Sequence, residues 1–374
     1  MILSYRYRIE PNKAQSLALA KMLVDFCEIY NAALEHRITA YRHGSIINCF
    51  DQIKTLPKIR DDLPHQRQWG ADAQAQVLRR LDKAYASFFR RVKSGEKAGF
   101  PRFRAPDRYH SADIRVGHGL MIRKTERLSL IGVPGEIKVF WHRTMPSYPK
   151  SAILSRNAGK WFIIFRVEVA PVERASPESI GIDLGLTSLV ALSNGETIER
   201  ANITKRHAAQ LRRRQRALAR CKRGSNGRRK ARAAITKLQA HIGASRRDAL
   251  HKVSASIVAR FGRIAIEDMT ITGMTRSILA KSVYDAAWGT LTDMLAYKAS
   301  RAGCELVKVD PRGTSQTCPE CGTVKAKTLK ERLHRCPCGC RLDRDVAAAM
   351  VVHFRAFGIW PGLGHETPSQ RVAA

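Results

Sequence analysis

The sequence predicts a mixed α/β protein of several domains, and three features indicate this. Strand-like segments dominate residues 98–172, short apolar strands alternate with helices from residue 178 onward, and five cysteines crowd into residues 318–340. A chain of 374 residues is long enough to form two or three domains with substantial cores. A composition of 44% hydrophobic and 26% charged residues excludes wholesale disorder.

The charge balance predicts a polyanionic partner. Lys and Arg number 66 and Asp and Glu 32, so the formal net charge is +34. An isolated protein with this charge repels itself unless a polyanion neutralises it. The sequence has no basic amphipathic helix suited to a lipid surface, no apolar stretch of spanning length and no secretory signal. We therefore expect a cytoplasmic protein that binds nucleic acid, with neither a membrane nor a small-molecule substrate as its partner.

Two helices are expected near the N-terminus, after a first strand at residues 2–9. Apolar side chains at helical spacing predict one helix that ends near Gly44 and another that ends near Gly95. The aromatic residues of the second helix are expected in the core. Its other face is basic and could contact phosphates: Arg79, Arg80, Lys83, Arg90, Arg91 and Lys93.

The next segments change to strands separated by turn residues. They are residues 120–133, 136–142, 151–157 and 160–169. Together with the first strand they predict a small all-β module formed by residues 1–12 and 98–172. The helical segment, residues 13–97, is then an insertion in this module.

The C-terminal half mixes both types of element. Short apolar strands are predicted at 179–186, 189–193, 196–200, 263–269 and 305–309, with a helix at 284–301. Residues 201–232 hold thirteen Lys and Arg and no acid, with helical spacing interrupted at residues 224–227. A run of one sign this long repels itself unless it lies along phosphates, so we expect two helices that line a nucleic-acid groove.

Three carboxylates stand at unusual positions. Asp183 lies in an apolar strand, Glu267 ends another, and Asp345 begins a short helix over residues 347–352. An ionised carboxylate in such a place is costly unless a cation neutralises it. Two Mg²⁺ or Mn²⁺ ions held by such acids would stabilise the attacking and leaving oxygens of phosphodiester hydrolysis. Structural roles remain open, because Asp183 could start a turn, Glu267 could cap the next element and Asp345 could be an N-cap.

The order of these elements favours the metal interpretation. A strand with Asp, a hairpin, a strand with Glu and a helix with Asp follow one another as in an RNase H-like fold. The neighbouring acids Asp268 and Asp343 are poorer candidates, because they lie off the strand or in the loop before the helix.

The cysteine cluster predicts a structural zinc ion. There are two knuckles, TCPECG and RCPCGC, and fourteen residues separate Cys321 of the first from Cys336 of the second. Cys318, Cys321 and Cys336 are the first three expected ligands, and the fourth is Cys338 or Cys340, with His334 as an outside candidate. Four thiolates leave no position for water, so the zinc is structural. The scattered cysteines are expected as small buried hydrophobes: Cys27, Cys49, Cys221 and Cys304.

Taken together, these motifs resemble those of the TnpB family, the transposon-encoded RNA-guided nucleases formerly called OrfB transposases and related to type V CRISPR effectors. The matching segments are GIDLGL, IAIEDM, VDPRGTSQTCPECG, CGCRLDRDVAAAM, the N-terminal YRYRIEPNKAQ and GFPRFR. The resemblance covers nearly the whole chain. The zinc-ribbon block that runs into Asp-Arg-Asp is its most specific part.

The resemblance implies a domain plan. A wedge-like β-barrel (1–12 and 98–172) with a helical recognition lobe (13–97) would precede a RuvC-like nuclease domain (178–313 and 341–356). A zinc ribbon (314–340) would interrupt that domain, and a tail (357–374) would end the chain. The implied partners are a guide RNA and double-stranded target DNA, in a prokaryotic cell and associated with the nucleoid.

The same resemblance implies the catalytic residues. Carried over by motif, the metal-binding triad is Asp183, Glu267 and Asp345. Because all three acids are present, we do not expect this chain to be one of the nuclease-dead relatives that only bind DNA. The family often has Asn two and six residues after the last Asp, where this chain has Ala347 and Val351. This departure removes no metal ligand, although it could alter local packing.

Two other functions remain open from the sequence. A transposase acting directly on transposon ends would share the fold and metals but need no RNA. A non-catalytic regulator would use only the zinc ribbon and the basic helices. Glu267 on its strand argues against the regulator, which needs no set of metal-ready acids.

Overall fold

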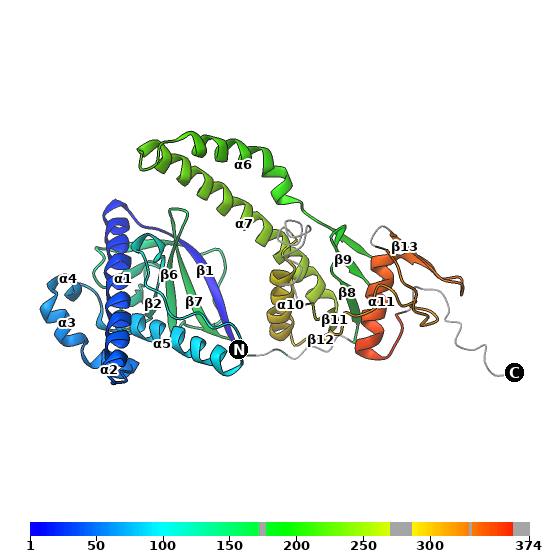
Figure 1. Ribbon diagram of the computed structural model, residues 1–374, viewed down its shortest axis with the longest axis horizontal. Coiled ribbons are helices and arrows are strands. Elements are labelled where there is room, and N and C mark those ends of the chain that lie inside the picture. Colours follow the sequence, from blue (N-terminus) through cyan, green and yellow to red (C-terminus); the bar gives the residue numbers. More distant parts are fainter. Residues whose placement is uncertain (171, 173–176, 270–285, 329–330, 362–374) are drawn as a thin grey trace. The chain divides into compact units, whose positions relative to one another are not determined.

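The computed structural model describes residues 1–170, 172, 177–269, 286–328 and 331–361, and it divides into two compact units (Figure 1). The first unit is Met1–Val169 and the second begins at Ala170. In the described parts of the chain, no helix is long and apolar enough to cross a membrane. The predicted start of a helix at Tyr284 lies outside the described residues.

The first unit is built on an antiparallel sheet of seven strands in the order β2-β6-β7-β1-β5-β4-β3. Their bounds are β1 Ile2–Glu10, β2 Ser111–Arg115, β3 Leu120–Ile122, β4 Leu128–Leu130, β5 Glu136–Phe140, β6 Ser151–Asn157 and β7 Lys160–Glu168. The N-terminal strand pairs with β7 from Ile2↔Glu168 to Ile9↔Trp161, so it completes the module as predicted. An isolated bridge joins Val116, just after β2, to Leu120 of β3, and the sheet is a curled half-barrel.

The helices of the first unit follow β1 and precede β2 along the chain. They are α1 Lys13–Arg42, α2 Cys49–Lys54, α3 Leu56–Asp62, α4 Pro64–Arg67 and α5 Ala71–Lys93, with a short 3₁₀ turn at Pro106–Arg108. A capping box of Asn12 and Gln15 starts α1, because each side chain accepts a hydrogen bond from the other residue's backbone N–H. The apolar stripes of α1 and α5 share one core with the sheet.

Some residues expected in that core lie on the surface. Phe89 and Val92 of α5 are 58% and 53% exposed, and Tyr41 of α1 is 77% exposed. The helical spacing was correct, but α1 and α5 extend past the elements that cover their apolar faces. The sequence also missed β2, a five-residue strand whose half-buried face carries Asp113 and Arg115.

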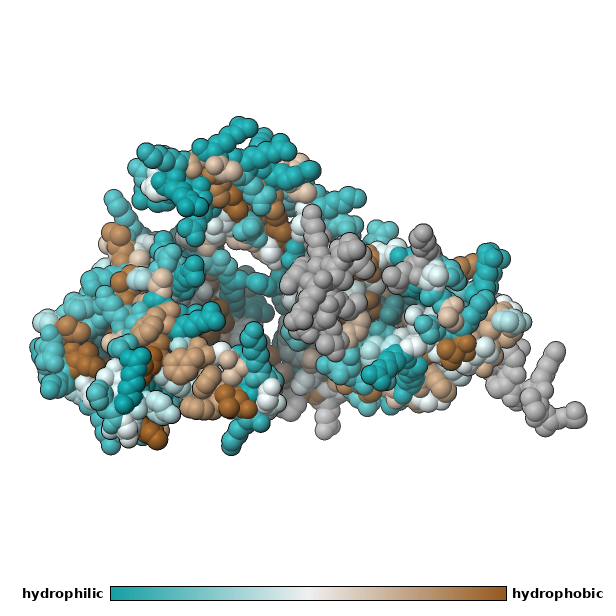
Figure 2. Space-filling view, viewed as in Figure 1, coloured by the Kyte–Doolittle hydropathy of each residue, from teal (hydrophilic) through white to brown (hydrophobic). Residues whose placement is uncertain are grey.

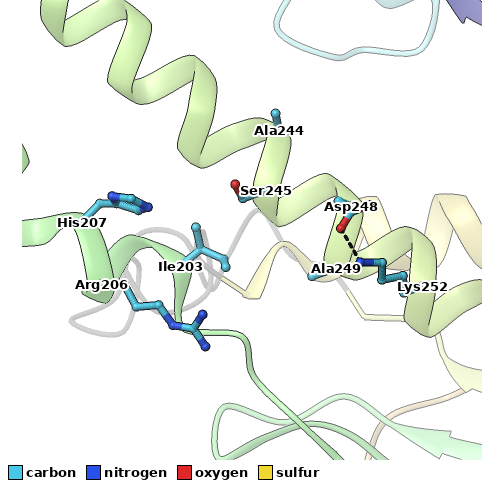
Figure 3. A pocket seen from close by; sticks show the side chains of 8 residues that line it. All are labelled: Ile203, Arg206, His207, Ala244, Ser245, Asp248, Ala249 and Lys252. Atoms are coloured by element: carbon cyan, nitrogen blue, oxygen red, sulfur yellow. Dashed lines mark ion pairs between the residues drawn. The ribbon is translucent and has the colours of Figure 1, made fainter.

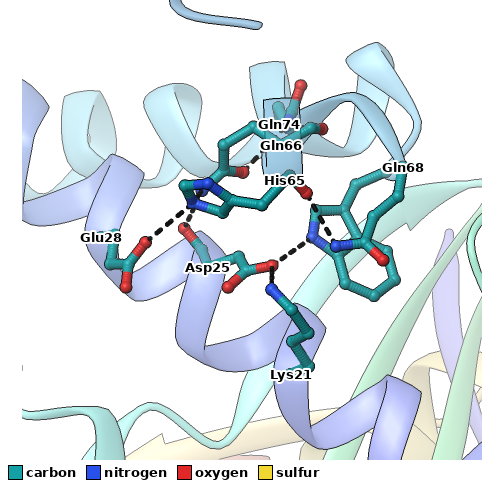
Figure 4. A network of polar contacts seen from close by, with 8 residues as sticks. Lys21, Asp25, Glu28, His65, Gln66, Gln68 and Gln74 are labelled. Atoms are coloured by element: carbon teal, nitrogen blue, oxygen red, sulfur yellow. Dashed lines mark hydrogen bonds and ion pairs between the residues drawn. The ribbon is translucent and has the colours of Figure 1, made fainter. Parts of the chain in front are cut away.

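A buried carboxylate joins the helices of the first unit (Figure 4). Asp25 is 3% exposed, and its Oδ2 accepts hydrogen bonds of 2.7 Å from both Trp69 Nε1 and Lys21 Nζ. Gln66 donates to the Asp25 carbonyl at 3.2 Å and accepts from Gln74. This network satisfies a group that would otherwise be costly to bury, so it positions α4 against α1.

The second unit contains a mixed sheet in the order β10-β9-β8-β11-β12. Its strands are β8 Ser179–Asp183, β9 Ser188–Leu192, β10 Thr197–Glu199, β11 Arg263–Glu267 and β12 Glu305–Val309. The first three are antiparallel, whereas β11 runs parallel to both β8 and β12. Each strand prediction for this half is confirmed within a few residues.

Helices cover both faces of this sheet, so the unit has three layers. One face packs on α7 Asn226–Arg260 and α10 Trp288–Ala302, through residues such as Ile182, Ile266 and Leu291. The other face packs on α11 Arg344–Phe357, with Ala265 and Val352 in contact. Alternation along the strands therefore assigns Ile264 and Ile266 to the α7 face and Ala265 to the α11 face.

The long basic segment forms a hairpin of two helices, α6 Ile203–Arg220 and α7 (Figure 1). In α6 no residue is buried, whereas α7 buries Ile235, Leu238 and Ile242 toward its partner and Leu250 and Ile257 in the core. Ser225 caps the start of α7, which confirms the predicted interruption at residues 224–227. Figure 2 shows that hydrophilic side chains dominate the surface of this hairpin.

Candidate functional site

The strand β8 brings Asp183 to the face of the sheet that α11 covers. Ile180 and Ile182 point into the α7 side, so Gly181 and Asp183 point to the other side. A Cβ on Gly181 would lie 2.2 Å from the carbonyl oxygen of Ala349, so only glycine permits α11 to lie this close. Asp183 is the last residue of β8 and is partly buried.

Glu267 occupies the matching position on the neighbouring parallel strand. The last pair between β8 and β11 is Ile182↔Ile266, and Asp183 and Glu267 each follow it by one residue. Neighbouring strands lie about 4.8 Å apart, so the two carboxylates leave the same edge and face of the sheet side by side. Glu267 is 8% exposed, and its Oε1 accepts a hydrogen bond of 2.5 Å from the hydroxyl of Thr314.

The third acid enters from α11, which starts earlier and ends later than predicted. Asp343 is the N-cap, and its Oδ1 accepts hydrogen bonds from Asp345 N at 2.8 Å and Val346 N at 3.2 Å. Asp345 is therefore not the N-cap, and its carboxylate lies 3.6 Å from Arg344 Nε in an ion pair whose two side chains are largely buried. A Cβ on Gly185 would lie 3.3 Å from Asp345 Oδ2, which places this carboxylate beside the loop that leaves β8.

Burial raises the pKa values of two of these acids, Asp183 and Glu267. Burial raises the pKa of Asp183 well above its usual range, and the charges of Glu267 and Asp345 add to this, opposed by Arg344. Burial also raises the pKa of Glu267, opposed by the Thr314 hydrogen bond and by Arg355. The direction means that Arg344 and Arg355 do not fully offset the cost of burying the ionised Asp183 and Glu267 carboxylates.

The neighbouring acids have other partners. Asp268 forms an exposed ion pair with Lys308, 3.2 Å between Oδ1 and Nζ, and Asp343 is occupied as the helix cap. Thr314 is a contributor to the site that the sequence did not single out. It follows β12 in the run Asp-Pro-Arg-Gly-Thr, where the only available signal was a small polar residue just before the first cysteine knuckle.

Four cysteines come together at the other end of this segment. The Sγ atoms of Cys318, Cys321, Cys336 and Cys338 all lie within 4.8 Å of one another. Cys318 and Cys338 are 3.7 Å apart and Cys321 and Cys336 are 3.4 Å apart, close to the ~3.8 Å edge of a tetrahedron with zinc–sulfur bonds of ~2.3 Å. A four-cysteine cluster of this size and chemistry fits Zn²⁺.

Cys340 lies outside this cluster. It is 3% exposed and belongs to a separate group with Cys318 and His334. The backbone explains the difference, because Cys336 N donates to Cys340 O and Gly339 N to Cys336 O in a tight turn that holds Cys338 at its tip. A two-stranded hairpin, β13 Leu333–Arg335 and β14 Arg341–Asp343, then leads directly into α11.

A third group of potential ligands has a simpler explanation. Asp25, Glu28 and His65 also lie within 4.8 Å of one another. Asp25 Oδ2 is already occupied by Trp69 and Lys21, and His65 Nε2 contacts Glu28 at 3.4 Å (Figure 4). These contacts belong to the network that joins α1 and α4, so they carry no metal assignment.

The basic hairpin divides its arginines between two roles. Some stabilise the hairpin itself: Arg228 donates to the carbonyls of Leu218 and Cys221 at 3.2 Å, and Arg214 donates to Ala234 O at 2.5 Å. Others line one shallow groove along α6 together with Ala209 and Ala217: Arg212, Arg213, Arg216 and Arg220. Their spacing places them on one helix face, where the structure gives them no ion-pair partner among the described residues.

A second depression lies between α6 and α7 (Figure 3). Arg206 and His207 line it from α6, and Asp248 and Lys252 line it from α7. Asp248 Oδ2 and Lys252 Nζ form an ion pair of 2.8 Å, so these two charges neutralise each other within the depression. The surplus positive charge therefore lies along the arginine face of α6.

The fold and these sites define a two-unit, mixed α/β protein with an acidic sheet edge, a cysteine cluster and a basic hairpin. Its architecture matches the solved structure titled "Cryo-EM structure of the Cas12f1-sgRNA-target DNA complex", with a TM-score of 0.57, 14% identity and coverage of 91% of this chain and 82% of that one. At this identity the match establishes the fold.

Sequence comparisons identify the family. A protein of Streptomyces pristinaespiralis named "Putative RNA-guided DNA endonuclease" is 32% identical over 92% of this chain and 87% of its own length. A protein of Escherichia coli K12 named "Putative RNA-guided DNA endonuclease InsQ" is 30% identical over 72% of this chain and 71% of its own length. Family models described as "Probable transposase" and "Cas12f1-like, TNB domain" match residues 162–277 and 288–352. The chain belongs to the TnpB (OrfB/IS605) family.

One family model agrees less well with the structure. A model described as "Helix-turn-helix domain" matches residues 1–45. In this protein these residues form a strand, β1, followed by a single helix of 30 residues, α1. The segment therefore contributes a strand to the half-barrel and one long helix, with no second helix inside the matched range.

Proposed function

We propose that this protein is an RNA-guided DNA endonuclease that hydrolyses phosphodiester bonds with Mg²⁺ or Mn²⁺. The observation that carries the proposal is the placement of Asp183 and Glu267 at equivalent ends of adjacent parallel strands, with Asp345 entering from α11 on the same face. Family membership supports it, since the names of both bacterial relatives above contain "RNA-guided DNA endonuclease".

The strand order of the second unit supports an RNase H-like, RuvC-type domain. Three antiparallel strands continue into two parallel ones, and Asp183 and Glu267 lie on the adjacent inner strands β8 and β11. In the proposed plan residues 178–313 and 341–356 form this domain and residues 314–340 the zinc ribbon. Residues 1–12 and 98–172 then form the wedge-like module around the helical lobe 13–97, and residues 357–374 form the tail.

The chemistry of the acids fits hard divalent ions. Carboxylate oxygens are the ligands that Mg²⁺ and Mn²⁺ prefer, and a pair of such ions ~3.5–4 Å apart is a common centre for phosphodiester hydrolysis. In the proposed site, Asp183, Glu267 and Asp345 hold two ions of this kind.

When bound, such ions would stabilise charge on the attacking and leaving oxygens and supply a hydroxide-like water. The chain itself orients the ligands. Thr314 fixes the Glu267 carboxylate, and Asp343 fixes the first turn of α11 and with it Asp345. Zinc, held by Cys318, Cys321, Cys336 and Cys338, would stabilise the ribbon that connects β12 to α11.

The proposed partners are a guide RNA and double-stranded target DNA. The related Cas12f1 structure contains an sgRNA and a target DNA according to its title. In this chain the net charge of +34 and the arginine face of α6 supply the matching positive surface. Base pairing between guide and target would then supply sequence specificity.

The test begins with RNA. The protein is purified from cells that carry its native flanking DNA, and the bound RNA is sequenced. One discrete RNA, with a constant part joined to flanking sequence, is expected and specifies the target for a cleavage assay. Only heterogeneous cellular RNA would overturn the guided mechanism in favour of direct action on transposon ends.

The nuclease step has its own test. Asp183→Ala is expected to abolish cleavage while RNA and target binding stay near normal, because the carboxylate holds metal and not nucleic acid. Asp268→Ala, a neighbouring acid paired with Lys308, is the matched control and should cleave normally. Equal loss of binding and cleavage in the Asp183 variant would contradict the catalytic role.

A further inference from the structure

Aromatic rings lie exposed at the end of α5 and in the segment that follows it. Phe89 is 58% exposed, Phe100 47% and Phe103 54%. Three large apolar side chains so close in sequence at the surface exceed the scattered exposure that is normal for a soluble unit. We call Phe89, Phe100 and Phe103 the aromatic platform. Hydrophobic patches lie among hydrophilic ones over α5 in Figure 2.

Partly buried rings hold this platform in place. The ring of Phe100 packs edge-on against Tyr85 at 5.6 Å and 88° and against Phe88 at 5.4 Å and 78°. The ring of Phe89 is stacked with Tyr85 at 6.3 Å and 26°. The rings of Phe89 and Phe100 are therefore held by their neighbours, in the geometry that aromatic pairs prefer, while both remain about half exposed.

The segment 99–104 is also fixed to α1, although it forms neither helix nor strand. Asn31 Nδ2 donates to Arg104 O at 2.8 Å, and Asn31 Oδ1 accepts from Arg104 N at 2.8 Å. Cys27 Sγ donates to the same carbonyl at 3.2 Å. These bonds anchor Arg104 beside Phe103, and the ring contacts with Tyr85 and Phe88 hold Phe100, so both ends of the segment are attached before any partner binds.

Positive charge surrounds the platform. The exposed cations are Arg90, Arg91, Lys93, Lys97 and Arg102. Among the described residues none of these has an ion-pair partner, and the one acid in the stretch 85–104, Glu96, accepts a hydrogen bond from Ser94. Open aromatic faces with unpaired cations beside them match nucleobases joined by phosphates, whereas an apolar protein partner would leave these cations unneutralised.

We propose that the aromatic platform binds unpaired bases of the guide RNA by stacking, while the cations around it contact the adjacent phosphates. The inference rests on the proposed function. RNA is favoured over target DNA because bases in duplex DNA are already stacked on one another, whereas loops and ends of RNA offer free faces. The contribution is then independent of base identity, since every base has an aromatic face.

The experiment separates stacking from charge. Full-length protein is titrated with a fluorescent single-stranded RNA oligomer and with an otherwise identical oligomer whose internal bases are replaced by abasic sites. Phe100→Ala is expected to weaken binding of the normal oligomer by about tenfold or more and to leave the abasic oligomer unchanged. Phe100→Trp should keep the wild-type affinity for both oligomers.

A matched control uses another exposed ring of the same unit. Phe50 on α2 is 69% exposed and has no ring contact with the platform in the described part of the chain, so Phe50→Ala should bind both oligomers like the wild type. Thermal unfolding of each variant is measured alongside. A loss of stability without loss of base-dependent affinity would show that the platform packs against protein, and the proposal would then be wrong.

Two further results would also overturn the proposal. If Phe100→Ala weakens binding of the normal and the abasic oligomer equally, the ring acts through the fold or the charge and not through stacking. If Phe100→Ala weakens binding of neither oligomer, Phe100 has no role in binding RNA. Failure of the proposed function gives a different result: wild-type protein would then bind neither oligomer, or would bind RNA and never cut guided DNA. Base-dependent binding by the platform can thus be judged apart from cleavage.

Discussion

The hydroxyl of Thr314 donates a 2.5 Å hydrogen bond to Oε1 of Glu267, across 47 residues of sequence. The same hydroxyl approaches Pro311 O at 3.0 Å, so it links the end of β11 to the turn after β12. Glu267 is 8% exposed, and a buried carboxylate oxygen needs such a donor. This bond joins the acidic sheet edge to the segment that carries the cysteine cluster.

Replacing Thr314 by Val should destabilise the protein and weaken divalent-metal binding. The loss leaves a buried carboxylate oxygen without a partner, which costs about 1–3 kcal/mol of unfolding free energy. Chemical denaturation and metal titration measure the two effects. Thr314→Ser keeps the hydroxyl and is expected to behave like the wild type; if it fails as badly as Val, the methyl group and not the hydrogen bond is what matters.

Metal-free protein should gain stability at neutral pH from Asp183→Asn. Burial and the charges of Glu267 and Asp345 raise the pKa of Asp183, so the folded state binds its proton more tightly than the unfolded chain does. The ionised carboxylate therefore destabilises the fold above that raised pKa. The stability difference between Asp183→Asn and the wild type should shrink as the pH falls below the raised pKa of folded Asp183. It should vanish below the ordinary pKa of an aspartate.

Thermal unfolding at several pH values, without added divalent ions, checks this expectation. Addition of Mg²⁺ should stabilise the wild type more than Asp183→Asn, because the ion neutralises the carboxylate that the variant lacks. An Asn variant that is less stable than the wild type at neutral pH would mean that the Asp183 carboxylate already has a neutralising partner in the protein.

Zinc binding should depend on Cys321 and Cys338 but not on Cys340. Serine at either of the first two removes one of the four clustered sulfurs, so zinc content and the stability of the ribbon should both fall. Cys340→Ser should retain one zinc per chain, as should Cys304→Ser, a buried cysteine outside the cluster. Elemental analysis of purified protein measures this, and zinc loss in the Cys340 variant would reassign the fourth ligand.

Arginines of the hairpin should separate into two functional groups. Arg213→Gln with Arg216→Gln removes two charges from the groove along α6, so the slope of log affinity against log salt for nucleic acid should fall by about 2. Arg228→Gln removes the donor to the Leu218 and Cys221 carbonyls and should lower helicity at the tip. Identical salt slopes for the double variant and the wild type would exclude the groove as a phosphate contact.

Local patterns predicted most of the elements, and the exceptions have physical causes. The β1 and α1 bounds follow from alternation and from the Asn12–Gln15 capping box, which are local. The strand β2 was missed because its short pattern carries charges on one side, and its place in the sheet comes from pairing with β6, about forty residues later. The exposure of Phe89 was also missed, because helical spacing cannot tell which turns of a helix are covered.

The sequence by itself determined the chemistry of this protein: its charge, the three candidate acids, the cysteines available for zinc and the order of its strands, because composition and short-range periodicity are properties of the chain alone. Only the tertiary structure decided which atoms meet. It placed Asp183 and Glu267 at the same level of adjacent parallel strands, gave the capping role to Asp343, brought Cys338 and not Cys340 to the cluster, and assigned Thr314 to Glu267. Strand register, helix bounds and turn geometry depend on packing between distant segments, and no local pattern encodes them.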